Sequence, residues 1–194
     1  EVQLFSTQAK RSPLAGLHHS KLRGRGVDFD QVRAYQAGDD VLVDIADARG
    51  TLCRPGDVIA RWGGEEFLMA CPDLTAAQAC TVAARLHERL GGARELAPGR
   101  AWDLTVSLGF APFPFFEEGR EGWEYAIRLA DRALYAAKDR RNAWAGLWGR
   151  HLPADITLQS VLETPEEAVR SGAIELVASY AVERLPQAPA TRAA

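Results

Sequence analysis

Residues 58–71 read VIARWGGEEFLMAC, two short apolar runs separated by Gly63, Gly64, Glu65 and Glu66. Each run has the length and the apolar content that are typical of a strand. Two adjacent glycines between such runs indicate a tight hairpin, because glycine adopts positive φ angles at little cost. The stretch therefore predicts a β-hairpin with two carboxylates at its tip.

Helical and strand-like segments alternate around this hairpin. A helix is expected after a cap at Asp73 or Thr75, and it should stop at the glycine pair 91–92. The other expected elements are an amphipathic helix within 41–49, a strand over 104–110, a long helix from Trp123 to about Arg140 and a strand over 144–148. The order helix, hairpin, helix, strand, helix, strand predicts an α/β fold, a mixed sheet with covering helices.

Changes in composition and hydrophobic pattern divide the 194 residues into four parts. The first is basic and has no sustained period, the second carries the alternating elements, the third holds a short helix and strand, and the last is a disordered tail rich in Pro and Ala. The expected bounds are 1–36, 37–148, 149–185 and 186–194.

Composition excludes several classes of partner. The net charge of -3 provides no general attraction for nucleic acid, and no apolar run approaches the ~20 residues of a membrane span. The basic residues Lys21, Arg23 and Arg25 are therefore interpreted as a solvated loop. Three widely spaced cysteines, Cys53, Cys71 and Cys80, are expected to be buried thiols in a reducing cytoplasm.

The hairpin tip has a composition suited to nucleotide chemistry. Glycines leave the backbone open to a phosphate or ribose, and carboxylates beside them can hold Mg²⁺ through oxygen ligands. Taken alone, the tip is a weak signal, and a solvated acidic turn is the favoured interpretation.

Four further segments lie at fixed offsets from the hairpin. The five segments, in order, are GDDVL at 38–42, RPGD at 54–57, RWGGEEF at 61–67, LTVSLG at 104–109 and ADRALYAAK at 130–138. With these segments, residues 37–142 resemble the GGDEF diguanylate cyclase domain in its GGEEF form, and the fold is expected to be the palm-like fold of nucleotidyl cyclases.

The resemblance implies that two GTP molecules, held by an antiparallel homodimer, are joined into cyclic di-GMP with Mg²⁺ or Mn²⁺. It implies that Glu65 binds the metal and activates the attacking 3′-hydroxyl, and that Glu66 assists at the metal or ribose. Arg54 and Asp57 match the family's RxxD motif for product inhibition. The implied substrate-binding residues are Asp39 for guanine, Gly63 and Gly64 beside the nucleotide, and Lys138 and Arg141 for phosphate.

The front of the domain departs from the family pattern. The family's first strand ends in a metal-binding Asp about 17 residues before the position of Asp39, where this chain has Leu22. Asp28 and Asp30 lie too close to Asp39, and Arg141 comes three residues after Lys138 where the family usually has four. These differences predict that the N-terminal strand is missing or replaced and that cyclase activity is impaired.

Residues 12–41 are similar instead to an uncharacterised bacterial family encoded beside MoxR-type ATPases, whose members often carry a von Willebrand factor A-like domain. The two families share the string GDDV. The chain could thus be a hybrid, formed by natural recombination, an assembly artefact or deliberate fusion.

Three hypotheses follow. The chain is a cyclase; or it is a degenerate module that binds cyclic di-GMP through Arg54 and Asp57 without turnover; or it is an inert hybrid that folds only partly. The sequence indicates no regulatory input.

Overall fold

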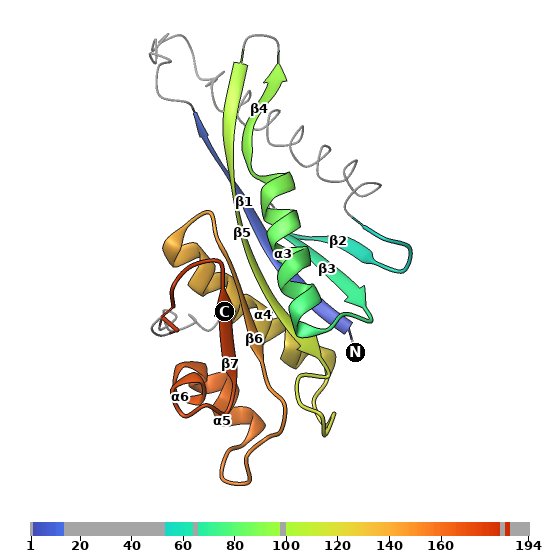
Figure 1. Ribbon diagram of the computed structural model, residues 1–194, viewed down its shortest axis with the longest axis vertical. Helices are drawn as coiled ribbons and strands as arrows, with labels where there is room; N and C mark the ends of the chain where they lie inside the picture. Colours follow the sequence, from blue (N-terminus) through green and yellow to red (C-terminus); the bar gives the residue numbers. More distant parts are fainter. Residues whose placement is uncertain (1, 14–52, 64–65, 98–99, 183–184, 187–194) are drawn as a thin grey trace, which may run out of the picture.

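The computed structural model describes residues 2–13, 53–63, 66–97, 100–182 and 185–186 (Figure 1). Its strands are β1 (Val2–Pro13), β2 (Val58–Gly63), β3 (Glu66–Pro72), β4 (Gly92–Ala97), β5 (Arg100–Phe113), β6 (Trp144–Trp148) and β7 (Glu175–Ala178). Its helices are α3 (Ala76–Leu90), α4 (Trp123–Arg140), α5 (Leu158–Glu163) and α6 (Pro165–Arg170). The α/β prediction is confirmed, whereas the helix expected within 41–49 lies outside the described residues.

The strands form one mixed sheet in the order β2-β3-β1-β5-β6-β7, and β4 pairs with the first part of β5. The β5–β6 pair is parallel, and the other neighbours are antiparallel. The sheet therefore places the β2–β3 hairpin on one side of β1 and the longer β5 on the other (Figure 1).

Strand β1 is the main difference from the sequence expectation. Residues 1–40 showed no periodic pattern, yet Val2–Pro13 forms a strand between β3 and β5. Of the two alternatives, a missing strand is wrong, because a strand fills this central position. Its residues, VQLFSTQAKRSP, include no Asp or Glu. The apolar residues are few and irregularly spaced, so the pairing partners decide the structure here.

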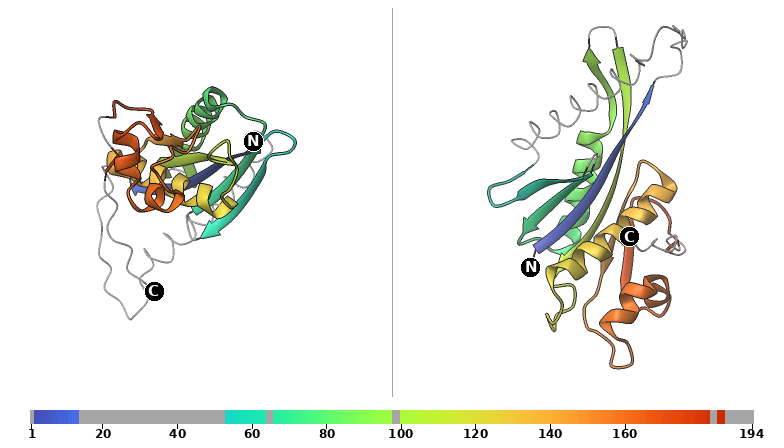
Figure 2. Two further views of the ribbon diagram at one scale, coloured as in Figure 1. Left: turned by 90° about the horizontal axis from the view of Figure 1, so that it is seen from below. Right: turned by 180° about the vertical axis from the view of Figure 1, so that it is seen from behind.

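The two faces of the sheet are covered by different helices, α3 on one face and α4 on the other (Figures 1 and 2). Alternate residues of the strands follow this division, since successive side chains of a strand point to opposite faces. In β3, Phe67 and Met69 pack with the buried face of α3, and Leu68 and Ala70 pack against α4. At Gly109 the backbone of α4 lies so close that a Cβ would come within 2.1 Å of the Leu134 nitrogen.

Local signals fix the ends of the two long helices. Thr75 caps α3 in a capping box with Gln78, and the helix ends at Gly91, both within the sequence prediction. Helix α4 carries Glu124 in its first turn and basic residues in its last, which complements the helix dipole.

The C-terminal part packs on the α4 face of the sheet. Helices α5 and α6 and strand β7 lie in the region where a short helix and strand are expected, and β7 pairs with β6. The buried side chains of Val161, Ala168 and Leu185 join the core beneath α4. The Pro186 carbonyl accepts a hydrogen bond from Arg132 Nη2 at 3.2 Å, which ties the end of this part to α4. In the described part of the chain, no helix is long and apolar enough to cross a membrane.

Candidate functional site

The β2–β3 hairpin forms as the sequence predicts. The two strands are antiparallel, with Gly63 paired to Glu66 and a register shift between Arg61 and Gly63. Gly64 and Glu65 lie outside the described residues, as does Asp39. Of the expected catalytic carboxylates, the structure therefore places Glu66, at the first position of β3.

Glu66 meets a cation from a distant part of the chain. Lys138 Nζ, in the last turn of α4, lies 3.6 Å from Glu66 Oε1, and the two side chains are 31% and 39% exposed. Water screens such a pair, so it contributes little to stability and can separate when a ligand offers better partners. The fold thus brings together two of the residues that the sequence analysis assigned to nucleotide binding.

Arg141 lies directly after α4 in a tight turn. Its φ is 58° and that of Asn142 is 47°, so both residues are in the left-handed region. Asn142 Oδ1 accepts the Val106 amide at 3.3 Å and lies 3.1 Å from His87 Nε2. The Asn142 side chain thereby links the end of α4 to β5 and α3. The Arg141 side chain is exposed, and its backbone amide donates to the Lys138 carbonyl at 3.2 Å.

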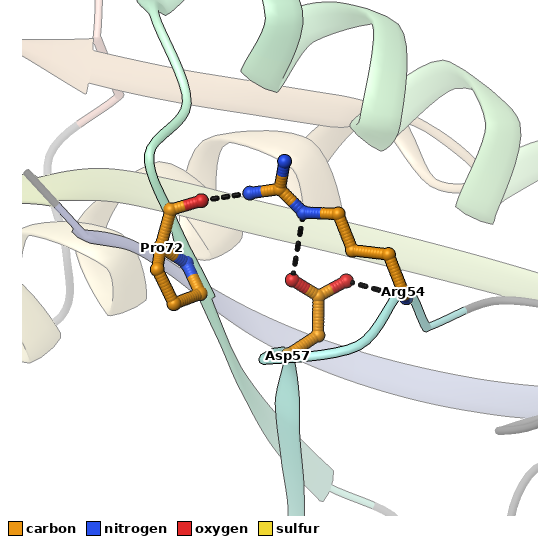
Figure 3. Close-up of polar contacts among 3 residues, drawn as sticks. All are labelled: Arg54, Asp57 and Pro72. Carbon is orange, nitrogen blue, oxygen red and sulfur yellow. Dashed lines mark hydrogen bonds and ion pairs between the residues drawn. The ribbon is translucent and has the colours of Figure 1, made fainter.

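The other expected pair, Arg54 and Asp57, is assembled at the opposite end of the hairpin (Figure 3). Asp57 Oδ1 accepts from Arg54 Nε at 3.1 Å, and Oδ2 accepts from the Arg54 amide at 2.9 Å. Arg54 Nη2 donates to the Pro72 carbonyl at the end of β3. The Arg54 side chain is 44% exposed, whereas that of Asp57 is 3% exposed.

Cys71, in the buried core, is an electrostatic neighbour of this pair. Burial raises the pKa of the Cys71 thiol to about 12, and the nearby negative charge of Asp57 adds to the shift. Cys71 belongs to the buried core on the α3 face, with Cys53 packed against the same cluster. The three cysteines form no disulfide with one another; Cys71 is buried, and Cys53 and Cys80 are partly buried.

The described residues do not supply a full set of carboxylate ligands for a metal ion. In the ranges that the structure describes, no three His, Cys, Asp or Glu side chains gather closely enough to hold an ion. Opposite Glu66 in the sheet stands Gln8 of β1. A second metal carboxylate would therefore have to come from residues other than those of β1.

Two groups that support these sites were missed by the sequence analysis. The Pro72 carbonyl belongs to the backbone, so its role depends on where β3 ends. Asn142 follows the ADRALYAAK segment, and its preference for positive φ was the one usable signal. A cavity of about 1060 Å³ is lined by α4, α6, Tyr180, Val182, Leu185 and Pro186, and its described lining includes none of the expected site residues.

Comparison with known proteins identifies the class. The family model for "Diguanylate cyclase, GGDEF domain" matches residues 32–143, more than half of the chain. The chain belongs to the GGDEF diguanylate cyclase family. The match begins well after β1 and includes part of residues 12–41, whose resemblance to the second family is not supported by these comparisons.

Two curated relatives are diguanylate cyclases. Diguanylate cyclase A of Treponema denticola is 29% identical over 126 residues, which cover 65% of this chain and 33% of that protein. Diguanylate cyclase DosC of Escherichia coli K12 is 30% identical over 122 residues, covering 62% of this chain and 26% of that protein. The chain thus spans about a third or less of the length of these relatives.

Solved structures confirm the fold. The GGDEF domain of TpbB (YfiN) from Pseudomonas aeruginosa matches 84% of this chain and 81% of its own length, with a TM-score of 0.56 and 23% identity. Diguanylate cyclase SiaD of Pseudomonas aeruginosa, solved with its activator SiaC, is 27% identical with a TM-score of 0.53, covering 73% of this chain and 48% of SiaD. The mixed sheet and its helices are therefore those of a GGDEF domain.

Proposed function

We propose that this chain is the catalytic module of a diguanylate cyclase. Two copies, arranged antiparallel, would each hold one GTP. The 3′-oxygen of each GTP attacks the α-phosphorus of the other, so two phosphodiester bonds form and two pyrophosphates leave. The observation that carries this proposal is the meeting of Glu66 and Lys138, 3.6 Å apart, at the hairpin tip of a family member.

The roles of the tip residues follow from their chemistry. Lys138 would bind terminal phosphate as a point charge, leaving Glu66 to face the metal or ribose. Arg141, on the turn after α4, would add a second phosphate contact. Gly63 and Gly64 would let the nucleotide approach the backbone, and Asp39 would accept hydrogen bonds from guanine.

Cyclases of this family use a divalent metal ion. Here Glu65 would hold Mg²⁺ or Mn²⁺, which stabilises the negative charge that develops during phosphoryl transfer. The proposal includes impaired turnover, because β1 offers no carboxylate opposite the tip. It also includes cytoplasmic residence, where GTP is available.

A second candidate function is binding of cyclic di-GMP without turnover. It is favoured by the contrast between β1, which contains no Asp or Glu, and the assembled pair of Arg54 and Asp57. In this case the chain would act as a receptor, and Arg54 would contact phosphate or a guanine edge bidentately. A junction of two families near residues 38–41 stays a separate hypothesis, which the gene sequence of the locus would test.

The purified chain, incubated with GTP and Mg²⁺, should yield cyclic di-GMP and pyrophosphate on chromatography. Glu65→Ala should abolish the product. Glu88→Ala, which removes an exposed carboxylate of α3, is the matched control and should not. Turnover should be below about a tenth of that of an intact family member, given the incomplete set of metal carboxylates.

Each other outcome has a defined meaning. Turnover equal to that of intact members would contradict the proposed impairment. Absence of product with Arg54-dependent binding of cyclic di-GMP would replace the first function by the second. Neither product nor binding would contradict both and leave the inert hybrid.

A further inference from the structure

The cavity of about 1060 Å³ is lined by three parts of the chain: the end of α4, helix α6 and the residues after β7. The match to the family model ends at residue 143, so α4 lies inside it and the other two parts lie outside. The described lining shares no residue with the hairpin tip or the Arg54 pair. Small-molecule sites have volumes of about 300–1000 Å³, so this cavity has the size of a ligand site that the family assignment does not explain.

Two arginines from different helices line the cavity. Arg140 lies in the last turn of α4, and Arg170 lies in the last turn of α6. Both side chains are exposed, and within the part of the chain that the structure describes neither forms an ion pair. A guanidinium group binds a carboxylate through two parallel hydrogen bonds. Each helix therefore supplies one cation that a ligand acid group can use.

The acidic residues of the lining limit the charge of the ligand. Glu166 Oε2 lies 3.3 Å from Arg132 Nη2, and the two side chains are 16% and 15% exposed, so the Glu166 charge is balanced within the wall. Asp139 is the other carboxylate of the described lining. Three arginines against two carboxylates leave one positive charge in excess. This balance favours a monoanion over a phosphate monoester, which carries about −1.5 to −2 charges at pH 7.

Arg132 also has a donor that the fold does not use. Its Nη2 donates to Glu166 and to the Pro186 carbonyl, two groups of the lining. Its Nη1 is buried and has no hydrogen-bond partner among the described residues. A buried N–H without an acceptor costs free energy, which an acceptor on a ligand, directly or through a water, would recover.

The ring of Tyr180 gives the cavity a flat apolar surface. Its hydroxyl donates to the Ala136 carbonyl at 2.9 Å, and the Arg140 guanidinium lies 5.5 Å from the ring centroid. Burial raises the pKa of Tyr180, which keeps the ring neutral. Val169 and Leu185 add aliphatic surface to the lining. A phenol ring and a guanidinium plane both stack with planar π systems, so the lining favours an aromatic body.

We propose that this cavity binds an aromatic monocarboxylate, whose acid group pairs with Arg140 and Arg170 and whose rings pack against Tyr180. The ligand bridges α4 and α6 and so holds the C-terminal part of the chain against α4. This inference does not rest on the proposed function, because it requires neither GTP nor cyclic di-GMP.

Three probes with one ring system test the charge and the place of binding. Naphthylacetate, naphthylethylamine and naphthylethanol are titrated into the full chain, and amide NMR spectra follow each titration. Naphthylacetate should bind with a dissociation constant of about 1 mM, the alcohol about tenfold more weakly and the amine more weakly still. The amide signals of Arg170, Tyr180 and Val182 should shift with naphthylacetate, whereas those of Arg54 and Asp57 should not.

Substitutions of exposed residues then identify the groups that bind the acid. Arg140→Ala and Arg170→Ala should each weaken naphthylacetate binding about tenfold. Arg170→Glu should reverse the preference, so that naphthylethylamine binds more tightly than naphthylacetate. Asp139→Asn removes a competing charge and should strengthen naphthylacetate binding about threefold. Arg128→Ala, which removes an exposed arginine of α4 outside the described lining, is the matched control and should leave the affinity unchanged.

Each contrary result overturns the inference. Naphthylacetate at about 10 mM that shifts no amide signal of the lining would show that the cavity does not take this ligand class. Equal affinities for the acid and the amine would contradict pairing with the arginines. Equal dissociation constants for Arg170→Ala and Arg128→Ala would place binding elsewhere. None of these results bears on whether the chain makes cyclic di-GMP, which is measured separately with Glu65→Ala.

Discussion

The two ends of the β2–β3 hairpin carry two sites built in different ways. Glu66 opens β3 and Pro72 closes it, so at ~3.3 Å per residue the sites lie about 20 Å apart. The Arg54 site uses residues within one turn and the end of the adjacent strand. The tip site needs β3 and α4, whose contacting residues are far apart in the sequence.

The difference extends to the surroundings of the charges. The Asp57 carboxylate is buried and its hydrogen bonds come from its own loop, whereas Glu66 and Lys138 are partly exposed. A buried, fully bonded carboxylate is preorganised, and an exposed ion pair is easily separated by a ligand. The comparison teaches that the Arg54 site, proposed to bind cyclic di-GMP, can stay assembled even if the site proposed for catalysis at the hairpin tip is incomplete.

The largest effect is expected from Gly109→Val. Because α4 lies directly on Gly109, the added side chain would displace the helix and lower the free energy of unfolding by about 3 kcal/mol, measured by urea titration. At temperatures where the variant stays folded, its affinity for GTP should fall more than its affinity for cyclic di-GMP. An equal fall in both affinities would contradict the independence of the two sites.

Gly122→Ala is the matched control for this substitution. Its added Cβ would meet only the end of the flexible Glu124 side chain, at 2.8 Å. The free energy of unfolding should fall by less than about 1 kcal/mol, the range of an altered helix cap. An equal loss in both variants would show that the contact with α4 is not what matters.

Lys138→Met should raise the KM for GTP about tenfold, since the variant keeps the length of the side chain and loses its charge. The affinity for cyclic di-GMP should stay unchanged, because Arg54 lies at the other end of the hairpin. Arg128→Met on the exposed face of α4 serves as control. Equal effects of Lys138→Met on both ligands would contradict two separate sites.

Asn142→Ala should lower the free energy of unfolding by about 1 kcal/mol, because the side chain links the end of α4 to Val106 and His87. Asn142→Gly removes the same contacts but tolerates the positive φ of 47°. The difference in unfolding free energy between the two variants, measured by thermal unfolding, gives the contribution of the backbone conformation at this position. If neither variant lowers the free energy of unfolding, the Asn142 side chain does not support the tip site.

The smallest effect is expected in how the free energy of unfolding falls with rising pH under alkaline conditions. The pKa of Cys71 is raised from 9.0 to about 12 in the folded chain, so the unfolded thiol ionises first. The contribution of this thiol is therefore full below pH 9 and is lost as pH rises from 9 to 12. Cys71→Ser should flatten the fall in unfolding free energy just above pH 9.

Other groups also titrate at alkaline pH, and they remain in the Cys71→Ser variant. Burial raises the pKa values of Tyr125, Tyr180 and Cys80. Asp57, Arg54 and Cys53 are the charged or titratable neighbours of Cys71. An identical slope for Cys71→Ser and the parent chain would mean that these other groups account for the whole alkaline loss.

Local patterns predicted the elements that local interactions control. The glycine pair of the hairpin, the Thr75 cap, the stop at Gly91 and the apolar face of α4 each led to an element that the structure contains. The family motifs also led to the Arg54 pair and to Lys138. For the hairpin, the helix ends and the Arg54 pair, neighbouring residues carry the physical cause, whereas Lys138 meets Glu66 from a distant part of the chain.

The remainder depends on contacts that no local pattern encodes. Strand β1 is weakly patterned and owes its structure to β3 and β5, and β4 was not expected beside β5. The Pro72 carbonyl and the buried orientation of Asp57 follow from how the turn seats against the end of β3. Roles assigned to Asp39, Gly64 and Glu65 stay predictions, since these residues lie outside the described ranges.

The central place of β1 has a consequence for how the sheet is assembled during synthesis. Val2 faces Pro72 on one side and Phe113 on the other, so β1 leaves the ribosome long before either partner exists. Contacts between residues so far apart form late, which slows folding and leaves strand edges exposed meanwhile. Newly made chains should therefore depend on chaperones until β5 has been translated.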